Sequence, residues 1–99
     1  MPPRTYTVYI LTNRYRTVFY IGMTNDLERR LQEHRSGRGS RFTAQYRVTD
    51  LIYTETYPTP GDAIRREKQL KGWRRAKKLD LIRRTNPDLA ALDAPRNGA

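Results

Sequence analysis

The sequence predicts an α+β domain, in which a small three-stranded antiparallel sheet is flanked by helices in the order ββαβαα. Two short segments of β-branched and aromatic residues are separated by a polar stretch, a third such segment follows later, and helical patterns lie between and after them. The 99 residues are enough for one domain with one core. The apolar share is only 36%, so we expect the seven tyrosines to supply part of the core.

The first two strands are expected to form a hairpin. Residues 6–11 (Tyr-Thr-Val-Tyr-Ile-Leu) and residues 18–22 (Val-Phe-Tyr-Ile-Gly) are rich in strand-forming types, and the polar residues 12–17 connect them. Tyr9 and Tyr20 lie in these strands and can face the same side as cross-strand neighbours. Packing is the ordinary role of such tyrosines, although phenol hydroxyls at a rim also orient or deprotonate water.

A helix is predicted after the hairpin. Gly22 ends the second strand at a place where the backbone either approaches another group closely or bulges. Asn25 is suited to the N-cap, with Glu28 at the third helical position, and residues 36–40 end the helix in a flexible loop. One face of this helix carries Leu27, Leu31 and the only histidine, His34, with Arg30 beside them. A lone histidine on such a face is more often packed than catalytic.

The middle of the chain is less regular. Residues 41–47 are ambiguous between a loop and a helical turn, and residues 51–57 are predicted to form the third strand. A helix should start with Thr59 as its N-cap and Pro60 at its first position, and run towards Trp73.

The end of the chain is predicted to hold a second basic helix and a tail. The helix spans residues 76–84 and ends before Asn86-Pro87. The ordered domain is therefore expected over residues 1–87, and residues 88–99 are expected to be poorly ordered because they are small and polar.

The charge of the chain indicates a polyanionic partner. Its net charge is +10, and residues 65–84 contain ten basic and two acidic residues. A structural protein of the ribosome, an acidic membrane surface or simple solubility are the alternatives, and the uneven distribution of charge disfavours the last. The residues expected to contact nucleic acid are Arg65, Arg66, Lys68, Lys71, Arg74, Arg75, Lys77 and Lys78.

The composition excludes sites that depend on cysteine and disfavours secreted and membrane-spanning proteins. The absence of cysteine excludes disulfides, thiolate metal sites and thiol catalysis. No apolar run is long enough for a signal peptide or a membrane span, so a cytoplasmic location is the default expectation.

Glu67 breaks the pattern of the third predicted helix. It lies in the middle of an apolar arc, where an unpaired carboxylate would be costly to bury and would need a metal ion or an arginine. A salt bridge to Arg30 or Arg74, or a place at the rim of the arc, is the alternative, and the residues alone favour it slightly. The other members of the arc are Ala63, Ile64 and Leu70.

Two tripeptides in the predicted hairpin resemble the signatures of the GIY-YIG nuclease family. Thr7-Val8-Tyr9 stands where Gly-Ile-Tyr is expected, and Tyr20-Ile21-Gly22 matches the second signature, with its tyrosine eleven residues after the first. The first signature keeps only its tyrosine. Threonine in place of glycine mildly restricts the backbone there.

The resemblance extends over residues 5–87 and is greatest to the small single-domain bacterial branch of the family. Residues 23–34 resemble the family's first helix, and residues 63–71 resemble the segment that carries its metal-binding glutamate. The catalytic residues that this resemblance implies are Tyr9, Tyr20, Arg30, His34 and Glu67, with Glu67 as the metal ligand and with Gly22 and Asn86 as supporting residues.

The resemblance implies an endonuclease that depends on Mg²⁺ or Mn²⁺ and hydrolyses phosphodiester bonds in DNA rather than RNA. We expect it to select structure more than sequence, as DNA repair and recombination nucleases do, as a monomer or a homodimer, with targeting by junction shape or a protein partner. Tyr9 or Tyr20 would act on the attacking water, Arg30 would hold the phosphate, and His34 would share proton transfer or position a tyrosine. A non-catalytic basic nucleic-acid-binding module on the same fold is the alternative.

Overall fold

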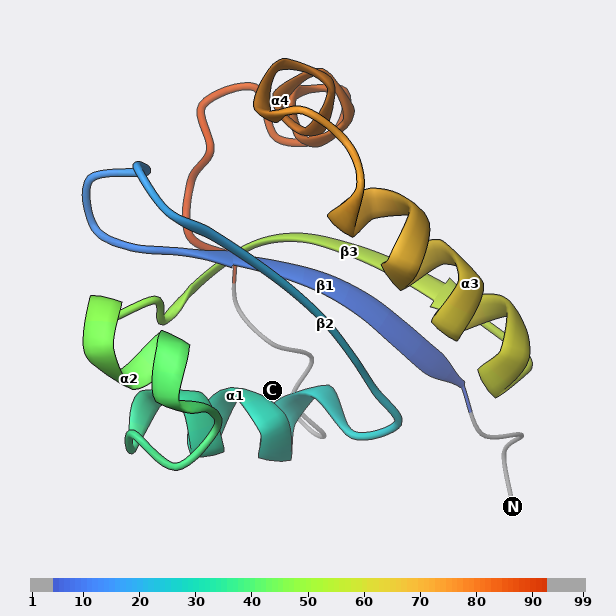
Figure 1. The fold of residues 1–99 in the computed structure, drawn as a ribbon, viewed down its shortest axis with the longest axis horizontal. Coiled ribbons are helices and arrows are strands. Elements are labelled where there is room, and N and C mark those ends of the chain that lie inside the picture. Colours follow the sequence, from blue (N-terminus) through green and yellow to red (C-terminus); the bar gives the residue numbers. More distant parts are fainter. Residues whose placement is uncertain (1–4, 93–99) are drawn as a thin grey trace.

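The computed structural model describes residues 5–92 and has the predicted α+β architecture (Figure 1). One short helix is added to the expected order, in the segment 41–47 that the sequence left open. The elements are β1 (Tyr6–Thr12), β2 (Phe19–Thr24), α1 (Leu27–Arg35), α2 (Arg41–Tyr46), β3 (Asp50–Tyr57), α3 (Pro60–Lys71) and α4 (Arg75–Arg83).

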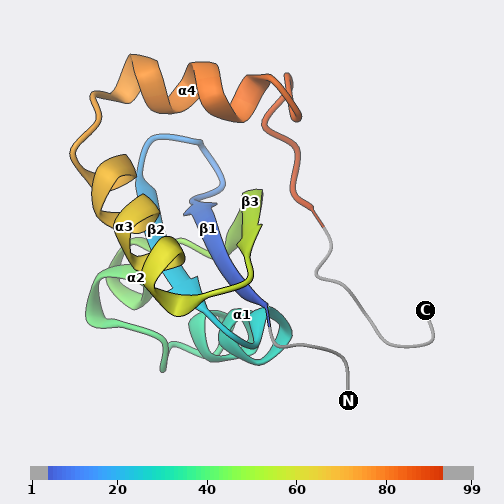
Figure 2. The same ribbon diagram turned by 90° about the vertical axis from the view of Figure 1, so that its right-hand side faces the viewer.

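The sheet is antiparallel, with strand order β2-β1-β3. Because β1 is central, its side chains are buried on both faces. Val8 and Ile10 pack with residues of α3 and α4, whereas Tyr9 and Leu11 pack with Leu31 of α1. The helices therefore form two layers, one on each side of the sheet, which Figure 2 shows from the side.

The starts of two helices test the predicted caps. Thr59 accepts a hydrogen bond from the backbone of Asp62 and Pro60 is the first residue of α3, as predicted. The predicted cap of α1 was wrong by one residue, because Asp26 rather than Asn25 accepts the bond from the backbone N–H of Arg29, at 3.2 Å. Either side chain can cap a helix, so the sequence did not separate the two positions.

The inner face of α3 is narrower than predicted. Ala63 and Leu70 are fully buried, but Ile64 is 41% exposed, so the expected four-residue arc was wrong at that position. Glu67 consequently lies at the border between the buried and exposed sides of the helix.

The segment after α4 packs on the body of the domain. Leu89 is 7% exposed, and the backbone N–H of Leu92 donates to the carbonyl of Leu51 in β3 at 2.7 Å. Leu89 and Leu92, which belong to the predicted tail, thus contact the body of the domain, and residues 93–99 lie outside the described part of the chain. Within residues 5–92, no helix combines the length and hydropathy that a membrane crossing requires.

Candidate active site

The ring of Tyr9 lies across the edge strand β2, at the position of Gly22. The two residues are direct partners in the β1–β2 ladder. A Cβ atom on residue 22 would overlap the hydroxyl and ring carbons of Tyr9. The glycine predicted as a supporting residue therefore has a physical role, since its missing side chain lets the phenol of the central strand extend over its neighbour.

Tyr20 lies on the same side of the sheet as Tyr9, as predicted. It pairs with Leu11 rather than with Tyr9, so the two tyrosines are diagonal neighbours, with ring centroids 6.3 Å apart. Tyr9 is 1% exposed, whereas Tyr20 is half-buried. Of the two phenols, Tyr20 is therefore the one open to a substrate.

Arg30 and His34 lie one turn apart on α1 and both reach Tyr9. The hydroxyl of Tyr9 is 3.0 Å from Nε2 of His34, and Nε of Arg30 donates to the same hydroxyl at 3.4 Å. The guanidinium also donates to the carbonyl of Gly39 at 2.9 Å and to Glu33 at 3.4 Å. The resemblance to the GIY-YIG family implied that these residues act together, whereas helical spacing alone placed only Arg30 and His34 near one face of α1.

The other nitrogen of His34 is held by a residue that sequence reasoning missed. Nδ1 lies 2.9 Å from Oγ1 of Thr43, which is fully buried, and Thr43 in turn contacts the hydroxyl of Ser40 at 2.9 Å. Ser40 is the N-cap of α2, which explains its position. The signal available in the sequence was this Ser-x-x-Thr spacing at a helix start, directly after Gly39.

Gly39 shows that the loop before α2 is packed closely on the imidazole. A Cβ atom at this position would overlap the ring and backbone of His34. The contact and the Arg30 bond to the Gly39 carbonyl hold the loop against α1.

Burial sets the protonation of the two groups at the centre. Desolvation, together with the positive charge of Arg30, lowers the pKa of His34 to about 4, so the imidazole is neutral at neutral pH. Desolvation raises the pKa of Tyr9 to about 12, although the hydrogen bond from Arg30 acts in the opposite direction. The contacts with Tyr9 raise the pKa of Arg30 above its ordinary value, and Glu33 and Tyr20 add to this effect.

Glu67 is neither turned to open solvent nor paired with the arginines that the sequence offered. Its side chain is 21% exposed, and its Oε1 accepts a hydrogen bond from Lys71, one turn later, at 2.8 Å. Of the two expected alternatives, a salt bridge to Arg30 or Arg74 was wrong for the described residues, whereas a place at the rim of the apolar arc is confirmed. Burial is the main cause of the raised pKa of Tyr9, and the negative charge of Glu67 makes the smallest contribution to it.

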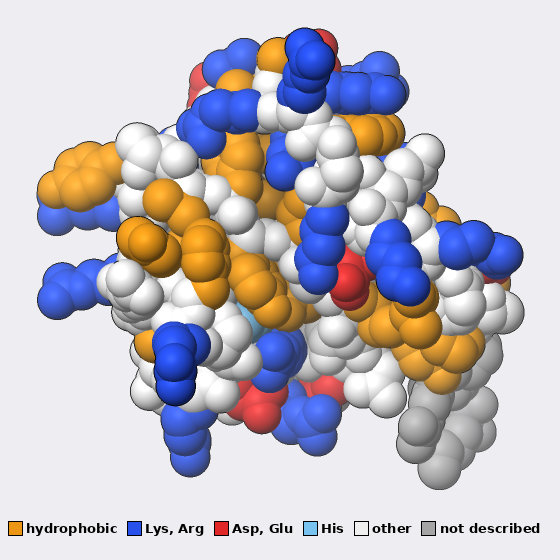
Figure 3. Space-filling model, viewed as in Figure 1, with side chains coloured by type: hydrophobic (Ala, Val, Ile, Leu, Met, Phe, Trp, Pro, Cys, Tyr) orange, Lys and Arg blue, Asp and Glu red, His pale blue; other side chains and the backbone are white. Residues whose placement is uncertain are grey.

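The predicted basic segment divides into engaged and free side chains. Arg66 donates twice to Glu55, at 2.9 and 3.0 Å, and Arg75 donates to two carbonyls of the β1–β2 hairpin. Lys68 and Arg74 are exposed. Figure 3 shows lysine and arginine side chains over α4 and around α3. The other residues predicted to contact nucleic acid lie as follows. Arg65 forms an ion pair with Asp62, Lys71 forms one with Glu67, Lys77 lies over the ring of Trp73, and Lys78 is half-buried.

Arg66 therefore has a structural role that the charge count concealed. Burial opposes ionisation of Glu55, but hydrogen bonds from Arg66 and from the hydroxyls of Tyr53 and Tyr57 lower the pKa of this carboxyl overall. The same guanidinium lies 5.0 Å from the centre of the Trp73 ring. The predicted contact of Arg66 with nucleic acid stays a prediction.

Asn86 supports the fold at a distance from the phenols. It is 7% exposed, and its amide donates to the carbonyls of Ile52, at 3.0 Å, and Ala90, at 2.8 Å. The backbone N–H of Ala90 donates back to its Oδ1 at 3.0 Å. The residue fastens the segment after α4 to β3 and contacts none of the other predicted site residues.

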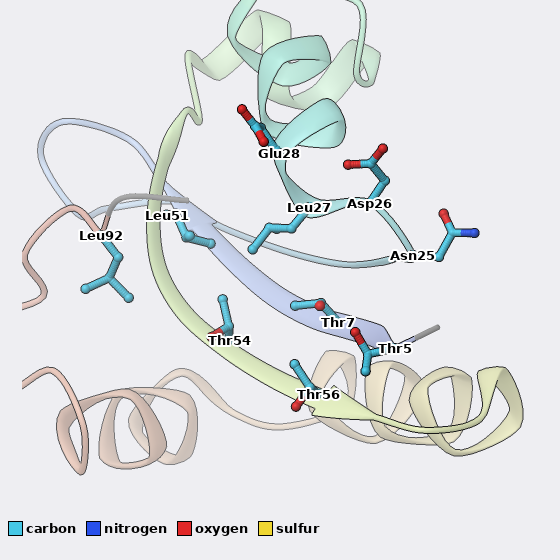
Figure 4. A pocket seen from close by; sticks show the side chains of 10 residues that line it. All are labelled: Thr5, Thr7, Asn25, Asp26, Leu27, Glu28, Leu51, Thr54, Thr56 and Leu92. Carbon is cyan, nitrogen blue, oxygen red and sulfur yellow. The ribbon is translucent and has the colours of Figure 1, made fainter. Parts of the chain in front are cut away.

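A hollow of about 510 Å³ lies between β1, β3 and the start of α1 (Figure 4). It is lined mainly by threonines and leucines, and its only charged residues are Asp26 and Glu28. No predicted catalytic residue lines it. Its negative charge is opposite to what a phosphate backbone requires, so we do not assign it to nucleic acid.

Comparison with known proteins identifies the family. The sequence profile of the GIY-YIG catalytic domain matches residues 5–80. A UPF0213 protein of Bacillus pumilus is 42% identical over 59 residues, which are 60% of each chain, and one of Staphylococcus saprophyticus is 38% identical over 63 residues, 64% of this chain and 77% of that one.

A solved structure has the same fold. The solution NMR structure of a UPF0213 protein from Bacillus halodurans superposes with a TM-score of 0.56 at 31% identity, covering 85% of this chain and 88% of that one. The aligned region thus spans less than two thirds of the Bacillus pumilus relative but most of the solved one. The chain belongs to the GIY-YIG family, and residues 5–80 form its nuclease-type catalytic domain.

Proposed function

We propose that the protein is a divalent-metal-dependent endonuclease that hydrolyses phosphodiester bonds in DNA, selects its substrate by structure, and serves DNA repair or recombination in the cytoplasm. The observation that carries this proposal is the convergence of Arg30 and His34 on Tyr9, and the half-buried carboxylate of Glu67 on α3 would supply the metal ligand. A purely binding module has no use for a carboxylate beside a polyanion.

The donor set fits a hard cation with a single protein ligand. No group of three His, Cys, Asp or Glu side chains gathers anywhere in residues 5–92. A cation at Glu67 would therefore complete its coordination with water and substrate oxygens, which suits Mg²⁺, and Mn²⁺ would replace it. When bound, the ion would neutralise charge on the phosphate and assist the leaving oxygen.

We assign the proton of neutral His34 to Nδ1. In this arrangement the hydroxyl of Thr43 donates to the carbonyl of Ser40, 3.2 Å away, and accepts from Nδ1. The neutral imidazole then carries its proton on Nδ1, and Nε2 accepts from the hydroxyl of Tyr9. Because the pKa of His34 is lowered to about 4, the imidazole is a weak base that orients Tyr9.

The roles of the two phenols follow from their exposure. Tyr9 is buried with its hydroxyl shared between Arg30 and His34, so we assign it a positioning role. Tyr20 is accessible and would accept a hydrogen bond from the attacking water. Arg30, which lies close to both phenols, would bind the scissile phosphate with the N–H groups that remain free.

The substitution Glu67→Gln tests the proposal. Cleavage of a labelled branched DNA in Mg²⁺ should fall at least a hundredfold, while binding measured with chelator should persist. Glu28→Gln is the matched control, because Glu28 is an exposed carboxylate on α1 outside the site. A Glu67→Gln protein that cleaves as fast as the unaltered protein would exclude the proposed site, and loss of Mn²⁺ binding in electron paramagnetic resonance would support it independently.

A further inference from the structure

Three aromatic side chains form a continuous strip beside the candidate active site. The ring of Phe42 stacks on that of Tyr20, with centroids 6.2 Å apart and planes inclined by 28°, and Tyr46 lies 5.0 Å from Phe42. Phe42 is 41% exposed and Tyr46 is 46% exposed. On the face shown in Figure 3, hydrophobic side chains form a band over α2 and β2.

The fold itself does not account for this exposure. The only buried residue of α2 is Thr43, which holds His34, so the helix is anchored by a polar side chain and by its cap. Phe42 and Tyr46, four positions apart, lie on the outward side. If the role of the strip were only to pack against the Tyr20 ring, that role would explain Phe42 but not Tyr46. The exposed ring of Tyr46 contacts Phe42 and extends the strip away from the catalytic groups.

Positive charge borders the strip. A shallow groove of about 290 Å³ is lined by Tyr20, Phe42, Lys71 and Lys78. The remaining lining residues are Phe19 and Ile21, and the ammonium of Lys71 also donates to Glu67 at 2.8 Å. Aromatic faces next to ammonium groups match the two parts of a nucleotide, its flat base and its phosphate.

We propose that the strip of Tyr20, Phe42 and Tyr46 is a stacking site for unpaired nucleobases, and that Lys71 and Lys78 bind phosphates of the same strand. In an intact duplex both faces of each base are covered by its neighbours, so such a site selects single-stranded DNA or a strand that is unpaired at a junction or flap. Because Tyr20 belongs to both the strip and the candidate active site, the bond next to the stacked base would be the one that is cleaved. This last point rests on the proposed nuclease function. Stacking on ring faces alone also predicts tolerance of sequence.

A binding experiment without metal tests the stacking site. An oligonucleotide containing 2-aminopurine is titrated with protein in chelator, and base stacking is read as quenching of its fluorescence. The unaltered protein should bind the single strand more tightly than the matching duplex and should quench. Phe42→Ala should weaken single-strand binding about fivefold or more and remove the quenching, whereas Phe42→Trp should retain both.

Matched control variants distinguish binding at the strip from nonspecific binding to the rest of the protein surface. Tyr15 is an aromatic residue outside the strip, 74% exposed, and Tyr15→Ala should leave binding unchanged. Lys78→Gln should weaken binding more than Lys68→Gln, because Lys68 does not line the groove although it carries the same charge.

The failure of this inference can be told apart from the failure of the nuclease proposal. Equal affinity for duplex and single strand, absence of quenching, or equal losses from Lys78→Gln and Lys68→Gln would overturn the stacking site even in an active nuclease. Quenching that Phe42→Ala removes, in a protein that cleaves nothing with Mg²⁺, would support the stacking site and overturn the nuclease proposal instead.

Discussion

The hydroxyl of Tyr9 lies 3.0 Å from Nε2 of His34, and the imidazole is held from behind by Thr43 at 2.9 Å. A central strand, the first helix and the short helix α2 thus meet in one line of hydrogen bonds. The line ends at a fully buried threonine, so its geometry is fixed before substrate arrives.

Substitution of each tyrosine by phenylalanine should separate their roles. Tyr20→Phe should lower the cleavage rate about a hundredfold with little change in the unfolding temperature, because the hydroxyl would act on water. Tyr9→Phe should also lower the free energy of unfolding by about 1–2 kcal/mol, since the buried His34 loses its partner. Cleavage kinetics and thermal denaturation measure both. Undiminished cleavage by Tyr20→Phe would contradict the assigned role.

Removing the Thr43 hydroxyl should disturb the histidine without touching substrate. Thr43→Val preserves shape but leaves Nδ1 of His34 without an acceptor, so the proton should redistribute between the two nitrogens. We expect slower cleavage by about tenfold or more and altered imidazole ¹⁵N shifts. Thr43→Ser should restore both. A valine variant with unchanged ¹⁵N shifts would show that Thr43 does not set the tautomer.

The buried histidine should make stability depend on pH. An unfolded histidine titrates near ~6.5, whereas burial and Arg30 lower the pKa of His34 to about 4. Between these values the unfolded chain binds a proton that the folded chain does not, so the free energy of unfolding should fall as the pH falls through this window and stay constant with respect to His34 above it.

Urea denaturation at about pH 7 and about pH 4.5 measures this loss, which we expect to be roughly 1 kcal/mol or more. Carboxyl groups titrate in the same range, so His34→Gln is the reference, and the histidine contributes the difference between the two pH profiles. Parallel profiles would mean that the pKa of His34 is not lowered.

Two glycine substitutions should have opposite outcomes. Gly22→Ala places a methyl group where the hydroxyl of Tyr9 lies, so it should displace the phenol, lower the free energy of unfolding by about 1–3 kcal/mol and impair cleavage. Gly61→Ala is the control, since nothing lies within 4 Å of its added Cβ in the first turn of α3, and it should be neutral or stabilising. Denaturation and cleavage assays of both variants measure these changes in stability and activity.

Arg66 and Lys68 should behave differently although both belong to the basic segment. Arg66→Ala leaves the half-buried Glu55 without its guanidinium and should lower the free energy of unfolding by roughly 1–3 kcal/mol. Lys68→Ala should leave stability unchanged and reduce DNA affinity slightly, an effect that added salt should remove. If Arg66→Ala were as stable as the unaltered protein, the assignment of Arg66 to the fold would be wrong.

The sequence predicted the strands and the main helices, because these depend on local patterns. That Tyr9, Tyr20, Arg30 and His34 act together was implied by the resemblance to the GIY-YIG family, since the residues alone favoured packing roles for the tyrosines and the histidine. The contacts of Arg66, Asn86 and Thr43 depend on residues distant in the chain or on burial. Net charge does not reveal that Glu55 engages Arg66, and a polar tail composition does not reveal that Asn86 fastens residues 88–92. Such pairings arise only when the layers assemble.

Arg30 reaches three separate segments through one flat group: the phenol of β1, the carboxylate of Glu33 on its own helix, and the carbonyl of Gly39. A slip of α1 by one turn, about 5.4 Å, would break the bonds to the phenol and to the loop together. Arg30 therefore fixes the position of α1 relative to β1 and to the loop, in addition to supplying positive charge. Lysine would keep the charge and lose the alignment, because its three N–H groups radiate from one atom, whereas the guanidinium spreads its donors over three nitrogens in one plane.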